Sequence, residues 1–152
     1  MRASLFGVAV MLMASPSWAA ELRMPDPALS PADVVEAQLK ALQLNDTPEA
    51  DAGILQTWVF AHPDNKRVTG PLPRFAAMIK GPQYRMLLDH RSHEVEEASR
   101  TDDEVVFSVT ITSESGEAAI YQWRVAKVAD GELVGNWMTI AVSAPSRAGQ
   151  SI

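Results

Sequence analysis

The chain has 152 residues, of which 47% are hydrophobic and 21% charged, and this composition predicts one globular domain. Nineteen acidic residues outnumber 13 basic ones, giving a net charge of −6, and the basic residues form no cluster. This balance argues against a nucleic-acid-binding surface and against binding to anionic membranes. The absence of cysteine excludes disulfides, thiol catalysis, cysteine-ligated metals and a lipid-anchored lipoprotein.

The first residues have the layout of a secretory signal peptide. Arg2 precedes an apolar run from Ala3 to Ala14, and Ser17 and Ala19 satisfy the small-x-small rule, which predicts cleavage after Ala19. The run is shorter than the about 20 apolar residues that a membrane anchor needs. The sequence therefore predicts that residues 1–19 are removed and that the protein is periplasmic or secreted, with no membrane anchor.

Helical signals occupy the first half of the remaining chain. Residues 20–29 carry two prolines and no hydrophobic period, and predict an extended leader. Ser30-Pro31-Ala32-Asp33 supplies an N-cap, a proline at the first helical position and an acid in the first turn, and predicts a helix to about Leu44. Thr47-Pro48-Glu49 begins a second helix with the same signals, which ends before His62-Pro63. A third helix is expected over about 71–80.

After the third helix the hydrophobic period changes to two, which is typical of strands. The predicted strands lie at 93–99, at about 105–111, at 121–125 and at 134–140. SESGE at 113–117 and ADGE at 129–132 predict hairpin turns, and residues 143–152 predict a flexible tail. Three helices followed by an antiparallel meander of about four strands make a single α+β domain over residues 30–142.

Three segments carry a resemblance to a known family: TWVFAHPDNKRVTGPLPRFAAMI at 57–79, YQWRV at 121–125 and WMTIAV at 137–142. They resemble a bacterial and plant domain family of unknown function, over residues 28–142. The element order is similar to that of the nuclear-transport-factor-two-like, or cystatin-like, cone. The resemblance implies a bent sheet that wraps helices and leaves a pocket open at one end. That superfamily holds isomerases, dehydratases, cyclases and epoxide hydrolases beside members that only bind or dimerise, so the fold assigns no activity.

The stretch FAHPDNKRVTGPLPRF at 60–75 predicts a rigid connector near the pocket mouth, with its basic side chains in solvent. The alternative is an anion-binding lip at the start of the third helix, where free backbone N–H groups attract negative charge. Its polar groups are His62, Lys66, Arg67 and Arg74. One glycine cannot form a phosphate cradle, which favours the connector.

Asp89-His90-Arg91-Ser92-His93-Glu94 is the one segment of metal-ligating residue types. In a strand, positions 90 and 93 point to opposite faces, so the segment predicts a polar sheet edge and not a metal site. No cofactor is predicted.

Aromatic side chains predict the pocket. The ligand-pocket candidates are Trp58, His62, Arg74, Tyr121 and Trp123, and the alternative is that the aromatic members simply fill the core. Alternation places Tyr121 and Trp123 inward together. Trp137 is out of phase with Val134, Met138 and Ile140, which predicts the other face of the sheet and an interface role.

Two classes of function fit these patterns. The first is an exported, non-catalytic module that binds a small apolar ligand or a partner, as a homodimer through the outer face of the sheet. The alternative is a pocket enzyme that performs proton transfer, such as an isomerase or dehydratase, with an acid or base from among Asp46, His62, Tyr84 and Asp89. No nucleophile elbow or distinct Ser/His/Asp set is present, which favours the first class.

Overall fold

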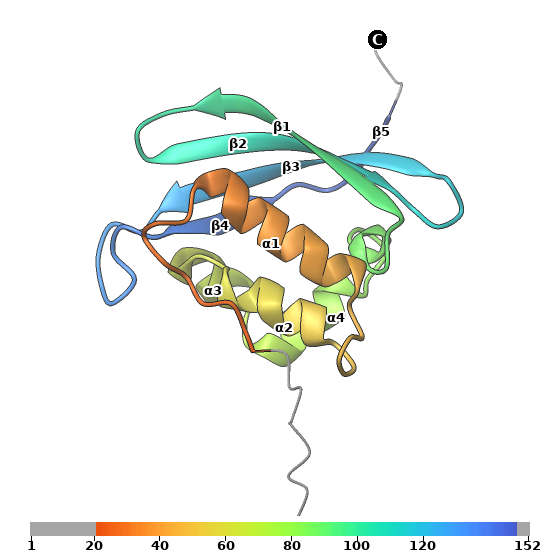
Figure 1. Ribbon diagram of the computed structural model, residues 1–152, viewed down its shortest axis with the longest axis horizontal. Coiled ribbons are helices and arrows are strands. Elements are labelled where there is room, and N and C mark those ends of the chain that lie inside the picture. Colours follow the sequence, from red (N-terminus) through yellow and green to blue (C-terminus); the bar gives the residue numbers. More distant parts are fainter. Residues whose placement is uncertain (1–20, 149–152) are drawn as a thin grey trace, which may run out of the picture.

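The computed structural model describes residues 21–148, so the predicted signal peptide and its cleavage site lie outside the described residues. These residues form an α+β domain in which the helices gather on one face of a bent antiparallel sheet (Figure 1). Its helices are α1 (Pro31–Gln43), α2 (Ala52–Val59), α3 (Pro63–Thr69) and α4 (Leu72–Ile79), with a 3₁₀ turn η1 (Arg85–Leu87). Its strands are β1 (Ser92–Arg100), β2 (Glu104–Thr112), β3 (Ala118–Lys127), β4 (Trp137–Val142) and β5 (Ser146–Arg147).

The sheet has the order β1-β2-β3-β4, with neighbouring strands antiparallel. β4 pairs with the second half of β3, and β5 pairs with Ala119 and Ile120 on the same strand. Between them, the Ser143 N–H donates to the Gln122 carbonyl at 2.9 Å. Residues 143–147 therefore run along β3, whereas the sequence predicts a flexible tail from residue 143.

The core forms where β2 and β3 face the first helix. Cross-strand partners on the inner face are Val105 with Val125, Phe107 with Trp123, Val109 with Tyr121, and Ile111 with Ala119. All eight side chains are buried, as the period of two predicts. The apolar stripe of α1 packs against them through Val34, Val35, Leu39 and Leu42. The capping box of Ser30 and Asp33 fixes where this helix begins.

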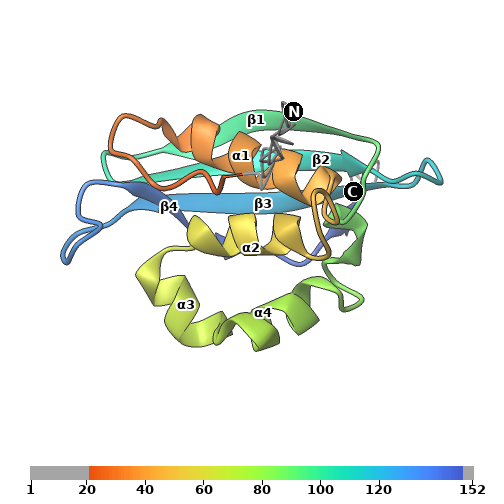
Figure 2. The same ribbon diagram turned by 60° about the horizontal axis from the view of Figure 1, so that its bottom comes forward.

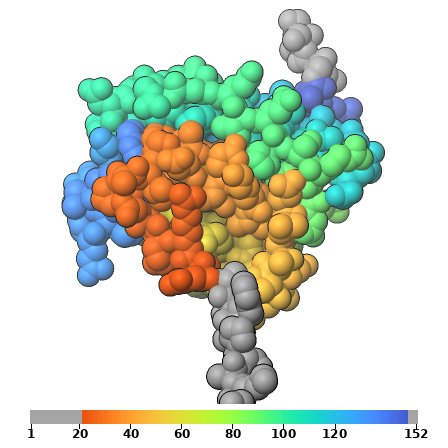
Figure 3. Space-filling model, in the orientation of Figure 1, coloured from red at the N-terminus to blue at the C-terminus, as the bar shows by residue number. Residues whose placement is uncertain are grey.

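Of the other helices, α3 contacts β4, α2 packs on α1, and α4 packs on α2 and α3. α2 lies between α1 and the pair formed by α3 and α4 (Figure 2). The leader lies against the helical layer (Figure 3), where the Arg23 N–H donates to the Gln56 side-chain oxygen at 2.7 Å and the Gln56 amide donates to the Arg23 carbonyl at 2.8 Å. No helix among residues 21–148 is both long and apolar enough to cross a membrane.

The structure corrects the predicted helix count. The described chain has four α-helices and not three, because α3 lies inside the segment expected to be a connector. His62 caps this helix, and Pro63 occupies its first position. None of its seven residues is buried, so it carries no apolar stripe by which periodicity could have revealed it.

The last long strand is also shorter than predicted. Val134 was expected to lie in it but is 54% exposed in the loop that precedes β4. Strand pairing places Trp137 opposite Lys127 and Thr139 opposite Val125, so Trp137 is on the helix-covered side, not the outer face. Its ring is partly buried against the core, with the Lys127 ammonium 5.0 Å from the ring centre.

Candidate functional site

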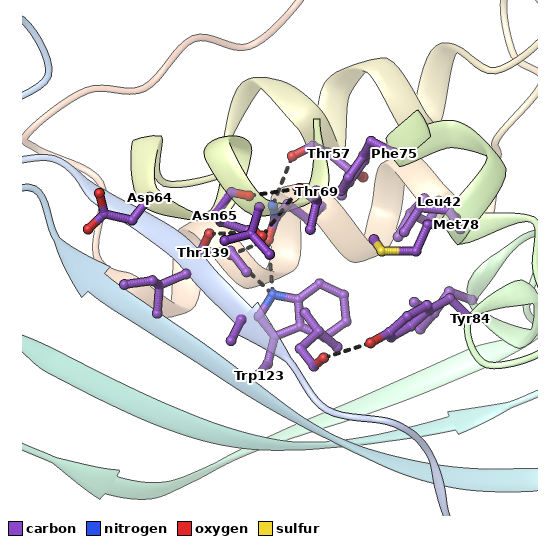
Figure 4. Close-up of a pocket in the computed structure, with 17 residues that line it drawn as sticks. Leu42, Thr57, Asp64, Asn65, Thr69, Phe75, Met78, Tyr84, Trp123 and Thr139 are labelled. Carbon is purple, nitrogen blue, oxygen red and sulfur yellow. Dashed lines mark hydrogen bonds between the residues drawn. The ribbon is translucent and has the colours of Figure 1, made fainter. Parts of the chain in front are cut away.

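A cavity of about 380 Å³ opens between β4 and the helices α3 and α4, with α1 and β3 behind it (Figure 4). α3 contacts β4, and α4 packs on α2 and α3, so the cavity lies among these elements. Seventeen residues line it: Gln38, Leu42, Thr57, Asp64, Asn65, Val68, Thr69, Phe75, Met78, Ile79, Tyr84, Leu87, Trp123, Thr139, Ile140, Ala141 and Val142.

A buried hydrogen-bond network forms the back wall of the cavity. The Gln38 side-chain oxygen accepts from the Trp123 indole N–H at 3.0 Å and from the Thr139 hydroxyl at 2.6 Å. The Gln38 amide donates to the Thr57 carbonyl at 3.0 Å. One glutamine thereby joins α1, α2, β3 and β4 at one point. Because these groups are buried, the bonds hold the wall rigid.

The cavity is polar at one end and apolar at the other. Asn65 and Thr69 of α3 lie near Thr139, and the Asn65 amide donates to the Thr139 carbonyl at 3.1 Å. Leu42 and Met78 lie toward the opposite end, where Tyr84 also projects (Figure 4). A bound molecule would meet hydrogen-bonding groups at one end and hydrocarbon at the other.

Two tyrosine hydroxyls hold the segment that contains Gln83 and Tyr84, which closes the apolar end of the cavity, against the sheet. The Tyr84 hydroxyl donates to the Val142 carbonyl at 2.9 Å, and the Tyr121 hydroxyl donates to the Gln83 carbonyl at 3.0 Å. Burial raises the pKa of Tyr84. Burial and the neighbouring Tyr84 raise the pKa of Tyr121 to about 12. Both phenols therefore stay protonated at neutral pH and serve as hydrogen-bond donors.

The predicted pocket residues fall in different places. Trp123 lines the cavity, and Tyr121 is fully buried behind the wall. Trp58 packs against Phe75, with ring centres 5.1 Å apart. Arg74 is exposed on α4 and does not line the cavity. His62 lines a separate, more polar hollow beside α3.

The basic residues proposed for an anion-binding lip do not converge. Arg67 pairs with Asp64, which lies one turn earlier in α3. Lys66 covers the Trp58 ring at 5.3 Å, and burial lowers its pKa. Arg74 points to solvent from the following helix.

Sequence reasoning did not find several residues of the cavity, among them Gln38, Asn65, Met78 and Thr139. One signal was available, because Gln38 is a polar residue inside the apolar stripe of the first helix. Such a position calls for a buried hydrogen-bond partner. The partners come from strands about 85 to 101 residues later, so their identity does not follow from local pattern.

His62 is a structural cap. Its ring nitrogen Nδ1 accepts the backbone N–H of Asp64 at 3.1 Å, which requires that nitrogen to be unprotonated. Burial lowers the pKa of His62 below its usual 6.5; the Asp64 carboxylate opposes this shift and Arg67 adds to it. The side chain thus stabilises α3 in its neutral form.

We expect acid to weaken this cap. Because the folded-state pKa of His62 is below 6.5, its contribution is fully present above 6.5 and is lost as the pH falls through the folded-state value. His62→Asn keeps a capping oxygen that does not titrate. Chemical denaturation should show a smaller loss of unfolding free energy in His62→Asn than in the native protein between about pH 7 and about pH 5. Equal losses in the two proteins would rule out this role.

The other predicted acids do not line the cavity. Asp46 accepts from the Asn45 side-chain amide at 3.1 Å and from the Asp51 N–H at 2.9 Å. The Asp89 carboxylate accepts from the Asn45 N–H at 3.3 Å. Both are exposed and hold the turn between α1 and α2. Tyr84 is the member of the predicted acid–base set that reaches the cavity.

The structure corrects the prediction for the two histidines at the start of β1. His90 and His93 were expected on opposite faces, but their ring nitrogens lie 2.7 Å apart. The reason is that β1 begins at Ser92, and Asp89 has a positive φ of 54°, so His90 belongs to a turn that folds back on the strand. Within residues 21–148, no group of three or more His, Asp or Glu side chains is arranged to hold a metal ion.

Comparison with known proteins places the chain in a family. No curated protein and no solved structure matches it. A family model described as "Domain of unknown function (DUF4864)" matches residues 28–143, which is most of the chain. The protein therefore belongs to this family of domains of unknown function, DUF4864.

Proposed function

We propose that this domain binds a small, uncharged and largely apolar molecule in the cavity, and that it does so without catalysing a reaction. The observation that carries the proposal is the cavity itself. Its volume of about 380 Å³ lies within the range of small-molecule sites, and mostly apolar side chains surround a few placed polar groups.

The ionisable groups of the lining support a ligand without charge. They are Asp64 and Tyr84. The Asp64 side chain is 56% exposed and pairs with Arg67, so it lies at the rim and its charge is already balanced. An anionic ligand would find no cation among the lining residues, and its desolvation would go uncompensated.

The same set of ionisable lining residues argues against the enzyme alternative. Proton-transfer catalysis needs an acid or base poised near the working pH. The Tyr84 hydroxyl is committed to the Val142 carbonyl, and its pKa is raised. Asp46, His62 and Asp89 are not among the lining residues.

The polar groups also suggest what the ligand offers. The Gln38 and Asn65 amides each donate one of their two N–H bonds within the protein, to Thr57 and Thr139 respectively. A remaining N–H on each suits an oxygen acceptor. We therefore propose a ligand with one carbonyl, ether or hydroxyl oxygen on a hydrocarbon body.

We place this activity outside the cytoplasm, as the amino-terminal signal predicts. We also infer a relationship to the nuclear-transport-factor-two-like cone, supported by the bent sheet, the element order and a cavity at one end. The outer face of the sheet, with partly exposed Val106, Ser108, Thr110 and Ile120, is the proposed homodimer surface.

A bulky substitution at Met78 tests the proposal. Met78 projects into the cavity from α4, so Met78→Trp should fill the apolar end (Figure 4). We expect the neutral fluorescent probe N-phenyl-1-naphthylamine to bind the native protein and to bind Met78→Trp about tenfold more weakly or worse, a loss of about 1.4 kcal/mol or more.

Ala77→Trp is the matched control, because Ala77 is the neighbouring residue of the same helix and is exposed. It adds the same indole on the solvent side, and its probe affinity should equal that of the native protein. Equal probe affinity in all three proteins would place the probe elsewhere, and no binding to the native protein would contradict the proposal.

A further inference from the structure

Outside the cavity, a chain of hydrogen bonds runs from Leu87 to the surface of α1. The ring of His90, which is 2% exposed, contacts the Leu87 carbonyl through Nδ1 at 2.7 Å. Its Nε2 lies 2.7 Å from Nδ1 of His93. Nε2 of His93 lies 3.0 Å from a carboxylate oxygen of Glu36. The cavity and its lining do not use these three side chains.

The groups at the two ends of this series of hydrogen bonds determine how many protons the two rings must carry. The Leu87 carbonyl only accepts, so Nδ1 of His90 must carry a proton. The other His90 nitrogen then meets Nδ1 of His93, and one proton must lie between them. At the far end an ionised carboxylate also only accepts, so Nε2 of His93 must carry a proton as well. Three bonds need three ring protons, whereas two neutral imidazoles carry two.

We infer that Glu36, His93 and His90 form a proton-binding relay, which holds one proton more than two neutral histidines and thereby fastens α1 to the segment that carries Leu87. Losing that proton leaves a bare ring nitrogen facing a carboxylate. Gaining a further one sets two N–H groups against each other between the rings. The state with one additional proton is the one that satisfies all three hydrogen bonds.

The additional proton belongs on His93. Burial lowers the pKa of His90; the bond to Leu87 opposes this, the charge of His93 adds to it and Asp89 opposes it. His90 is therefore the neutral ring, and His93 is the imidazolium beside the carboxylate. Nε2 of His93 lies 3.0 Å from the Glu36 carboxylate, and this pairing favours the charged ring at that end of the hydrogen bonds.

Among residues 21–148, no charged side chain other than Glu36 is hydrogen-bonded to either histidine. The other charged residues of the neighbouring elements are all exposed: Asp33 and Lys40 on α1, Arg85 on η1, Asp89 and Arg91 in the turn, and Glu94, Glu96, Glu97 and Arg100 on β1. The residues of β2 opposite the start of β1, Ile111 and Thr112, carry no charge. Glu36 is thus the acid bonded to the pair.

The relay bears on the cavity through its inner end. His90 holds the carbonyl of Leu87, and the Leu87 side chain lines the cavity. The same short segment carries Tyr84, which bonds to Val142 across the cavity. The proton on His93 therefore ties α1 to the segment that closes the apolar end, whether or not a ligand is bound.

Nitrogen–proton NMR of the imidazole rings tests this inference in the full chain. At about pH 7, within the range where histidine side chains change charge, the hydrogen-bond geometry predicts that His93 carries protons on both nitrogens and His90 on Nδ1 alone. Glu36→Gln supplies an amide that can donate to a neutral ring, so His93 should then carry a proton on Nδ1 alone. Glu94→Gln removes the same charge from an exposed neighbour, and its spectrum should match that of the native protein.

Stability gives a second readout. Glu36→Gln should lower the midpoint of thermal unfolding more than Glu94→Gln does, because Glu36 bonds to His93 whereas Glu94 is exposed. A singly protonated His93 in the native protein, or a doubly protonated one in Glu36→Gln, would overturn the inference. Should Glu36→Gln not fold, the native and Glu94→Gln spectra decide it alone.

Discussion

Gly53→Ala is expected to lower the free energy of unfolding by about 3 kcal/mol or more, because overpacking against backbone is among the costliest single changes. A Cβ atom at Gly53 would lie 2.2 Å from the carbonyl oxygen of Ala41 and 2.8 Å from its carbon. Both belong to the backbone of α1 and cannot rotate away. The Gly53 N–H also donates to the Asn45 carbonyl at 2.9 Å, which holds the two helices together at this point. Urea denaturation measures the change.

Gly81→Ala is the control for this prediction. The nearest atom to its added Cβ would be the Met78 carbonyl oxygen at 3.1 Å, and its φ is not in the left-handed region. The unfolding free energy should change by no more than about 1 kcal/mol in either direction. A Gly53→Ala protein as stable as Gly81→Ala would mean that α1 and α2 do not approach this closely.

Gln38→Leu is expected to be the second most damaging change, at about 3 kcal/mol. Leucine keeps most of the volume but removes both functional groups of the amide. The Thr57 carbonyl loses its side-chain donor, and the Thr139 hydroxyl loses its 2.6 Å acceptor. The Trp123 indole keeps Thr139 at 3.2 Å as a partner, which limits the loss. Each buried group left unsatisfied costs about 1 to 3 kcal/mol.

Thr139→Val completes a double-mutant cycle with Gln38→Leu. Valine removes the hydroxyl at nearly constant volume, so the two single changes both break the bond between Gln38 and Thr139. The double variant should therefore lose less than the sum of the single variants, by about 1 kcal/mol. Exact additivity would show that the two side chains do not share a bond in solution.

The sequence predicts those elements whose capping residues or hydrophobic alternation lie within the element itself. Ser30, Pro31 and Asp33 fix the start of α1, and alternation along 105–111 and 121–125 predicts the inward faces of β2 and β3. These succeed because capping and period depend on neighbouring residues alone. The α+β class follows from the same order of elements.

Other features depend on contacts that the sequence does not display. The helix α3 buries none of its residues, so only its cap and proline mark it, and the three prolines around it favoured a connector. The alternation predicts Trp137 on the outer face only if Val134 belongs to the same strand, whereas a loop with Gly131 and Gly135 at positive φ separates Val134 from β4. A phase error of one residue reverses every face in a strand.

Few of the residues that line the candidate site follow from the sequence. An inward Trp123 follows from alternation. Its partner Gln38 lies 85 residues earlier, and the residues at the polar end come from a helix that the periodicity missed. Opposite faces for His90 and His93 would require one strand through both, whereas the chain turns at Asp89 and β1 begins only at Ser92. In each case the fold brings together residues that are distant in the sequence, and the pattern around one of them does not indicate the other.

Native mass spectrometry of the protein recovered from its own cells without unfolding tests the binding account most directly. We expect the native protein and Ala77→Trp to carry the same small-molecule adduct, and Met78→Trp to lack it. The mass of the adduct would then identify the ligand class. Native protein recovered with an empty cavity, or an adduct that persists undiminished in Met78→Trp, would contradict the claim that this cavity binds a small ligand.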